Sequence, residues 1–118
     1  MDNKRKTGKD YEELAVKYLQ EEGYFIIEKN FQVRQGEIDI IARDNSTIVF
    51  IEVKYRGSSS SGHPLEAVTY GKQKKICKSA LFYMNKNKIS PDNTSIRFDV
   101  IGILGNEITH IKNAFDFV

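Results

Sequence analysis

Residues 36–56 constrain the fold more than any other stretch, because they contain two apolar runs joined by a short polar turn. The runs, over 38–42 and 48–53, are rich in β-branched residues and apolar on both faces, which is typical of central strands covered on both sides of a sheet. Residues 44–47 have the sequence Asp-Asn-Ser-Thr, which favours a turn. The sequence therefore predicts an antiparallel hairpin at the centre of a sheet.

Two acidic side chains at the open end of this hairpin are placed to face each other. With a loop over 44–47, Asp39 lies directly opposite Glu52, with Cβ atoms roughly 5 Å apart, and Lys54 follows on the same face. Facing carboxylates repel each other unless a cation lies between them, and a hard divalent ion is the obvious candidate. Because the chain has one cysteine, Cys77, and two distant histidines, any metal must be held by oxygen atoms.

Composition is that of an ordinary globular domain. The 118 residues are enough for one domain, 1–118, in which 1–7 are expected to form a flexible N-terminus. The sequence has no apolar run of membrane-spanning length and no signal-peptide core, so the predicted location is the cytoplasm, without membrane association. The net charge of +2 is too small to imply nucleic-acid binding by itself.

A first helix is predicted over residues 8–22. Thr7 and Asp10 resemble a capping box, and Gly23 is a stop signal. Glu12 falls inside the apolar arc of this helix, which leaves two interpretations open. It is either a first-turn acid favoured by the helix dipole, or a carboxylate directed at the sheet beside the facing pair.

The rest of the pattern predicts three more strands and a second helix. The expected elements are a strand over 24–33, a helix over 65–86 and a final hairpin over 95–104 and 107–112. The first strand, with Asn30 at a bulge or bend, directly precedes the central hairpin, so an antiparallel meander is the simplest start to the sheet. The second helix is expected to break near Thr69 and Gly71.

Three features have a plain structural interpretation. Residues 57–64, GSSSSGHP, form either a mobile flap over a site or a simple connector, and His63 within them is expected to have no role. Asp99 is the odd residue in an apolar strand, and a salt bridge to Arg97 or Arg56 is the favoured explanation.

A lysine-rich segment follows the start of the second helix. Residues 72–88 carry six lysines and no acid. A solvated helix face explains such a run more often than a phosphate track does. If the run does bind nucleic acid, the contacting residues are Lys72, Lys74, Lys75 and Lys78.

The acidic residues and the lysine together resemble the PD-(D/E)xK nuclease pattern: an acid on the first helix, Asp39, and Glu-Val-Lys at 52–54. The likeness extends over residues 8–115, through GKDYEELA, GEIDIIA, VFIEVKYR, EAV followed by KQKKI, RFDVIGI and ITHIKNAF. These motifs are similar to those of the YraN-like family of small bacterial proteins, which is related to archaeal Holliday-junction resolvases. One departure is Tyr11, where the family usually has glycine before the helix acid.

The resemblance implies a restriction-endonuclease-like fold, an α/β fold with a mixed central β-sheet flanked by helices. It also implies an active-site set of Glu12, Asp39, Glu52 and Lys54. Glu12 is preferred to its neighbour in this set by its spacing from Ala15. Gln73 is implied to support the site or orient the substrate.

The implied activity is Mg²⁺- or Mn²⁺-dependent endonuclease hydrolysis of phosphodiester bonds in nucleic acid, with structured or branched DNA as the expected substrate and 5′-phosphate ends as products. Asp39, Glu52 and the backbone carbonyl of Val53 would hold the ion, and Glu12 would bind through a water or a second ion. Lys54 would orient the attacking water and offset the charge growing on the phosphoryl oxygens.

A competing interpretation is a non-catalytic nucleic-acid-binding or adaptor protein that keeps the nuclease fold. The presence of all four active-site residues favours the enzyme. A purely structural or interaction domain is less favoured because it leaves the facing acids unexplained. DNA or RNA as the substrate, its shape, and a homodimer as the assembly stay open.

Overall fold

The computed structural model describes residues 7–56 and 63–118. The elements, in chain order, are α1 (Gly8–Glu21), β1 (Phe25–Val33), β2 (Gly36–Asp44), β3 (Thr47–Arg56), the 3₁₀ turn η2 (Pro64–Ala67), α2 (Tyr70–Lys86), the 3₁₀ turn η3 (Pro91–Asn93), β4 (Ile96–Leu104) and β5 (Glu107–Phe115). Over these residues no helix is long and apolar enough to cross a membrane. The expectations for residues 1–6 and 57–62, a flexible N-terminus and a flap or connector, lie outside the described residues.

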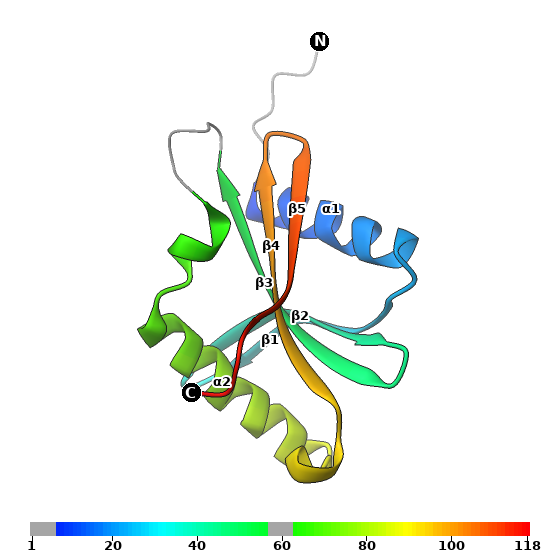
Figure 1. Ribbon diagram of the computed structural model, residues 1–118, viewed down its shortest axis with the longest axis vertical. Coiled ribbons are helices and arrows are strands. Elements are labelled where there is room, and N and C mark those ends of the chain that lie inside the picture. Colours follow the sequence, from blue (N-terminus) through cyan, green and yellow to red (C-terminus); the bar gives the residue numbers. More distant parts are fainter. Residues whose placement is uncertain (1–6, 57–62) are drawn as a thin grey trace.

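The strands form one sheet in the order β1-β2-β3-β4-β5 (Figure 1). β1, β2 and β3 make an antiparallel meander, β3 and β4 run parallel, and β5 is antiparallel to β4. The predicted mixed sheet of an α/β protein is therefore confirmed. The predicted hairpin register is confirmed as well, because Ile40 lies opposite Ile51 and Asp44 opposite Thr47.

A hydrophobic core lies on each face of the sheet. On one face, Ala15 and Leu19 of α1 pack against inward side chains such as Val49 and Ile51. On the other face, side chains of α2 pack against Phe50 and its neighbours. Consecutive residues of β3 alternate between the two cores, so this strand is covered on both sides, as its continuous apolar sequence predicts.

The helix boundaries follow local capping chemistry. The Thr7 and Asp10 capping box is present, and α1 ends at Glu21, one residue before the predicted end. The predicted break in the second helix is confirmed at Thr69, whose side chain accepts from the backbone N–H of Lys72 and caps α2. Gly71, however, lies inside the first turn of α2.

Two strand ends differ from the prediction. β1 begins at Phe25, because the backbone N–H of Tyr24 donates back to the carbonyl of Leu19 and so belongs to the end of α1. β5 continues to Phe115 rather than ending at residue 112. The extension passes through Asn113, which has a φ of 54° and lies near a register shift between β4 and β5. Asn30, where a bulge or bend was predicted, likewise has a φ of 54°, but the register shift between β1 and β2 lies earlier, between Ile26 and Glu28.

The sheet divides at the end of the central hairpin. The pairing of β2 with β3 extends only to Ile40 and Ile51. Before Ile40, β2 pairs with β1 alone, while β3 from Glu52 onward pairs with β4 alone. Figure 1 shows the resulting fork, with β1 and β2 diverging from β3 and β4. Asp39 and Glu52 are the first residues of the two arms.

Candidate functional site

The fork brings Asp39 and Glu52 together at its base. The Asp39 Oδ2 atom accepts a hydrogen bond of 2.8 Å from the backbone N–H of Val53, a group left free where the ladder ends. Glu52 is only 4% exposed. Burial of Asp39, together with the neighbouring charge of Glu52, raises the pKa of Asp39 from 3.8 to about 8. The two acids predicted to face each other therefore do interact unfavourably.

Two lysines contact the buried acid of this pair. The Nζ atom of Lys54 lies 3.3 Å from Glu52 Oε2, and the Nζ atom of Lys72 lies 3.5 Å from the same oxygen. Lys54 was predicted on the same face as Glu52, and the ion pair confirms that placement. Lys72 was predicted as a phosphate contact. That role stays a prediction, and the approach of Lys72 to Glu52 shows that the first turn of α2 lies at the fork.

Glu12 reaches the site from the opposite face of the sheet. Its Oε1 atom accepts a 2.7 Å hydrogen bond from the side chain of Asn30. Burial raises the pKa of Glu12, and the hydrogen bond from Asn30 opposes that effect. A cavity of about 210 Å³ is lined by Glu12 together with Asp39 and Val53. Of the two interpretations of Glu12, the structure agrees with a side chain directed toward the sheet.

Two residues at this cavity were missed by the sequence reasoning. Glu37 and Asn30 also line it, together with Gly8 and Tyr55. Glu37 stands two residues before Asp39 on a strand, and this alternating spacing was a usable signal. The pairing of Asn30 with Glu12 joins β1 to α1, and no local pattern predicts it.

Gln73 is not directed at the carboxylates. Its amide nitrogen donates a 3.1 Å hydrogen bond to the backbone carbonyl of Val68, the residue just before the cap of α2. This contact holds the start of the helix in place. Its predicted role in orienting a substrate stays a prediction.

The oxygen atoms at the fork suit a small divalent ion. Over residues 7–56 and 63–118, no group of three or more Asp, Glu, His or Cys side chains is placed to hold one ion together. Mg²⁺ usually keeps several waters and takes only one or two protein carboxylates. Asp39 and Glu52 meet that requirement. Because the N–H and C=O of an extended residue point to the same side of a strand, the carbonyl of Val53 also faces the fork.

Comparison with known proteins places this chain in a family. A family described as "Uncharacterised protein family UPF0102" matches residues 11–103. The chain belongs to the UPF0102 family. A UPF0102 protein of Persephonella marina is 51% identical to this chain over 109 residues, 92% of each protein. One from Aliivibrio fischeri is 48% identical over 114 residues, covering 95% of this chain and 93% of the relative. One from Coxiella burnetii is 46% identical over 113 residues, with the same coverage. The predicted YraN-like family is therefore confirmed.

The UPF0102 chain accommodates Tyr11, which stands where the resemblance implied a glycine, by ring stacking. The ring of Tyr11 lies parallel to that of Tyr55, with centroids 4.2 Å apart and an interplanar angle of 9°. Tyr55 is exposed on its outer side and lines the same cavity as Glu12. The ring of Tyr11 therefore packs on Tyr55 of β3 and does not fill the cavity.

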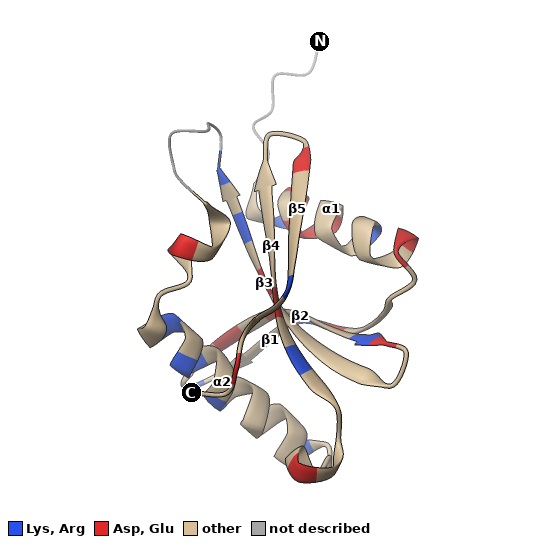
Figure 2. Cartoon of the chain, in the orientation of Figure 1, with Lys and Arg blue, Asp and Glu red and all other residues tan. Residues whose placement is uncertain are grey.

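The lysines of α2 make an uneven electrostatic surface on this UPF0102 protein. Figure 2 shows the positive residues gathered on the first half of α2, the half that lies at the fork. Lys75 and Lys78 are exposed, and the ammonium group of Lys74 lies 5.6 Å from the ring centroid of Tyr70. Lys74, Lys75 and Lys78 are therefore solvent-accessible, and Lys72, which pairs with Glu52, places the start of this cluster at the fork.

Asp99 is explained by structure rather than by chemistry at the fork. It is fully buried and receives hydrogen bonds from Arg97, at 2.8 and 2.9 Å, and from the backbone N–H of Asn113. The Nε2 atom of His110 lies 2.7 Å from it. Although burial raises its pKa, these partners hold the pKa of Asp99 below its usual value. The predicted pairing with Arg97 is confirmed, and it secures the irregular pairing of β5.

Proposed function

We propose that this chain is a metal-dependent endonuclease that hydrolyses phosphodiester bonds in nucleic acid, with structured or branched DNA as its substrate, on a restriction-endonuclease-like fold. The observation that carries the proposal is the buried acid pair at the fork. Asp39 is held beside Glu52 in surroundings that disfavour its ionised form and raise its pKa to about 8, and Lys54 is ion-paired with Glu52. A pair of acids kept in an unfavourable arrangement is typical of functional sites.

The wider arrangement supports this proposal. The mixed sheet with one helix on each face agrees with the fold implied by the resemblance. The acids lie where two arms of the sheet separate, and Asp39 lines the cavity that also contains Glu12. Lys72 lies next to Glu52, and the exposed lysines that follow it on α2 suit a phosphate backbone.

Each residue at the fork has a chemical role in the proposed reaction. Asp39, Glu52 and the carbonyl of Val53 would hold Mg²⁺ or Mn²⁺, which supplies charge to polarise a phosphate and to acidify a bound water. Lys54 stabilises negative charge on the phosphoryl oxygens and orients the attacking water through its ammonium protons. Glu12, across the cavity from Asp39, receives a proton or positions a water.

A cleavage assay tests the proposal. Labelled four-way junctions, flaps, single strands and duplexes are incubated with Mg²⁺ or Mn²⁺ and with wild type, Lys54→Ala or Asp44→Asn. Asp44 is the matched control for a charge change, because it lies on β2 and pairs with Arg97 away from the fork. We expect at least one substrate to be cut by wild type and by Asp44→Asn, and not by Lys54→Ala.

The same assay separates the enzyme from the competing interpretation. A wild-type protein that binds these substrates but cuts none of them with either metal would identify a binding or adaptor protein instead. Cleavage that persists equally in Lys54→Ala would locate the activity outside the fork and overturn the proposed site.

A further inference from the structure

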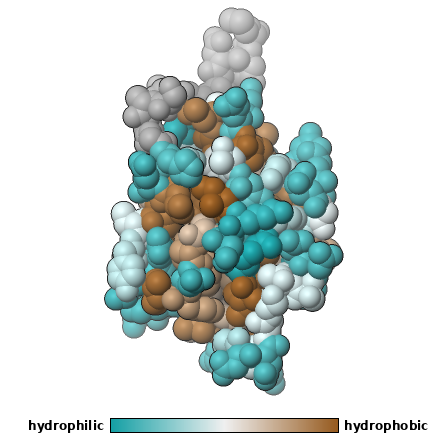
Figure 3. Space-filling model, in the orientation of Figure 1, coloured by the Kyte–Doolittle hydropathy of each residue, from teal (hydrophilic) through white to brown (hydrophobic). Residues whose placement is uncertain are grey.

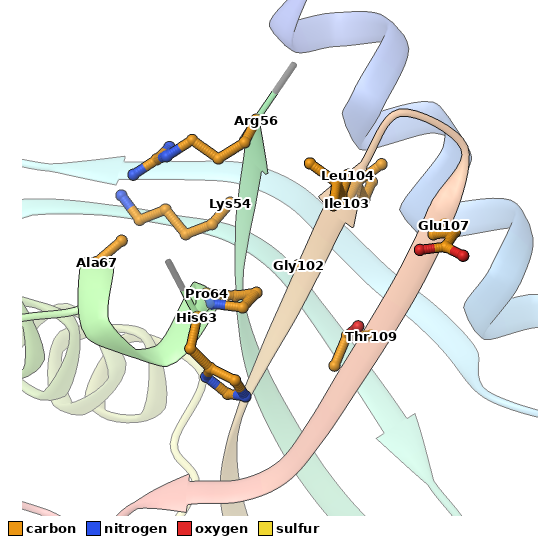
Figure 4. Close-up of a pocket in the computed structure, with 10 residues that line it drawn as sticks. All are labelled: Lys54, Arg56, His63, Pro64, Ala67, Gly102, Ile103, Leu104, Glu107 and Thr109. Carbon is orange, nitrogen blue, oxygen red and sulfur yellow. The ribbon is translucent and has the colours of Figure 1, made fainter. Parts of the chain in front are cut away.

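A second pocket lies beside the proposed site, on the face that carries Glu52 and Lys54. It has a volume of about 130 Å³ and lies between η2 and the outer ends of β3, β4 and β5 (Figure 4). Its lining includes Lys54, Arg56, Pro64, Ala67, Leu104 and Thr109. The pocket shares Lys54 with the fork, so a ligand seated in it is directly adjacent to the proposed reaction centre.

The walls of this pocket are mainly apolar and closely packed. Pro64 of η2 lies against Gly102 of β4 so closely that a Cβ atom at Gly102 would overlap its ring. Ala67, Ile103 and Leu104 extend the same apolar lining. Figure 3 shows hydrophobic surface where η2 meets the sheet. A flat, uncharged ring is therefore the kind of group that these walls fit.

The rim of the pocket is polar and carries both signs of charge. Lys54 and Arg56 extend in the same direction from β3, and Figure 4 shows their charged ends above η2. Thr109 and Glu107 reach the opposite side from β5. The cations suit a phosphate, while a hydroxyl and a carboxylate are acceptors for the exocyclic amino group of a base.

We propose that this pocket receives one unpaired nucleotide next to the bond that is cleaved. The inference rests on the proposed function and narrows its substrate to nucleic acid with an unpaired base at the cutting position. The sugar phosphate binds at Lys54 and Arg56, and the base lies against Pro64 and Leu104. A base inside a duplex has both ring faces covered by its neighbours, so it must leave the stack to enter, and the free-energy cost is smallest where it is already unpaired.

Binding measured without turnover tests the pocket. The probes are a DNA duplex and the same duplex with one splayed end, each carrying 2-aminopurine at the junction, in buffer with chelator. Thr109→Phe fills the pocket from the exposed side of β5, and Ala67→Phe fills it from η2. Ser46→Phe, at the exposed β2–β3 turn, is the control for an added surface ring.

We expect wild type and Ser46→Phe to bind the splayed DNA about 5-fold to 100-fold more tightly than the duplex, the range of one stacked base. The 2-aminopurine fluorescence at the junction should change on binding. Both filling variants should lose most of this preference while keeping duplex affinity and a wild-type melting temperature.

Two results would overturn the pocket assignment: no preference for splayed DNA in wild type, or a preference that survives in a folded filling variant. Cleavage is measured separately with Mg²⁺. Cleavage by wild type that both filling variants retain, with unchanged substrate choice, refutes the pocket and leaves the nuclease. Preference for the splayed end without any cleavage refutes the nuclease and leaves the pocket as a nucleotide site.

Discussion

Replacing Asp39 with asparagine should make the metal-free protein more stable, although it removes a half-buried native side chain. Asparagine keeps a carbonyl oxygen that can accept from the Val53 N–H, and it cannot ionise. The repulsion with Glu52 that raises the Asp39 pKa is therefore absent in the variant. A matched change at Asp44 should have the opposite sign, because Asp44 is ion-paired with Arg97 at 3.1 Å.

The size of the effect follows from the shifted pKa. An acid whose pKa rises from 3.8 in the unfolded chain to about 8 in the folded one binds its proton more tightly when folded. Proton binding by Asp39 therefore stabilises the folded protein fully below pH 3.8, and this stabilisation is lost as the pH rises toward 8. The loss reaches about 4 kcal/mol at pH 7, and Asp39→Asn should recover up to that amount. In a domain of this size the gain corresponds to a rise in Tm on the order of 10 °C.

Urea unfolding of wild type, Asp39→Asn and Asp44→Asn from pH 4 to pH 9, in chelator, measures this directly. The difference between Asp39→Asn and wild type should be near zero at pH 4, grow steadily toward pH 8 and then level off. Thermal melts with millimolar Mg²⁺ should show wild type stabilised and Asp39→Asn almost unchanged, because ligand stabilises only a native state that binds it.

The reasoning fails if Asp39→Asn is less stable than wild type at pH 8, or if the difference between them does not vary with pH. Either result would mean that Asp39 is a favourably paired structural acid. A wild-type protein that gains no stability from Mg²⁺ or Mn²⁺ would in addition remove the metal site.

Three other changes test other parts of the molecule. Lys54→Ala should reduce cleavage by at least about 100-fold while changing the affinity for fully paired duplex, which does not enter the pocket beside Lys54, by less than about threefold, because on this substrate the lysine acts on the transition state; single-turnover rates and binding titrations measure both. Changing Lys74, Lys75 and Lys78 to alanine should lower the salt slope of DNA binding by about 0.9 for each phosphate that the protein no longer neutralises, and an unchanged slope would remove α2 from the binding surface. Asp99→Asn should cost about 1 to 3 kcal/mol of unfolding free energy, because it weakens the hydrogen bonds that the fully buried Asp99 makes with Arg97 and His110 while Arg97 keeps its ion pair with Asp44; an unchanged unfolding free energy in urea would contradict the role assigned to this network.

The centre of the fold was predictable because its signals are local. Two apolar runs with a polar turn specify the hairpin and its register, and Thr7 and Thr69 mark helix starts through hydrogen bonds to the next turn. The course of β5 beyond residue 112 was not predictable. It depends on a hydrogen bond from the backbone N–H of Asn113 to Asp99 on the neighbouring strand β4. No sequence pattern near residue 112 predicts this bond.

The candidate site likewise has a part that the sequence predicts and a part that it does not. Asp39, Glu52 and Lys54 share one hairpin, so spacing alone places them together. The approach of Lys72 to Glu52 depends on how α2 packs across the sheet, which lies beyond any local pattern. The fork was also not predicted, because it depends on β2 pairing with β1 alone before Ile40 and on β3 pairing with β4 alone from Glu52 onward, and the second pairing joins segments that are distant in the sequence.

The division of the sheet also has a consequence for how the chain folds. β2 and β3 are joined by a tight turn, whereas β3 meets β4 only when Ile48 reaches Ile96 across the whole of α2. Local pairings close with little loss of chain entropy, so the hairpin forms before the parallel pair. Each folding molecule must then bring Asp39 up to Glu52 early, while much of the chain is still unfolded. Because the two ionised carboxylates repel each other, this early step becomes less favourable as the pH rises. The refolding rate should therefore fall with rising pH, and the unfolding rate should change much less.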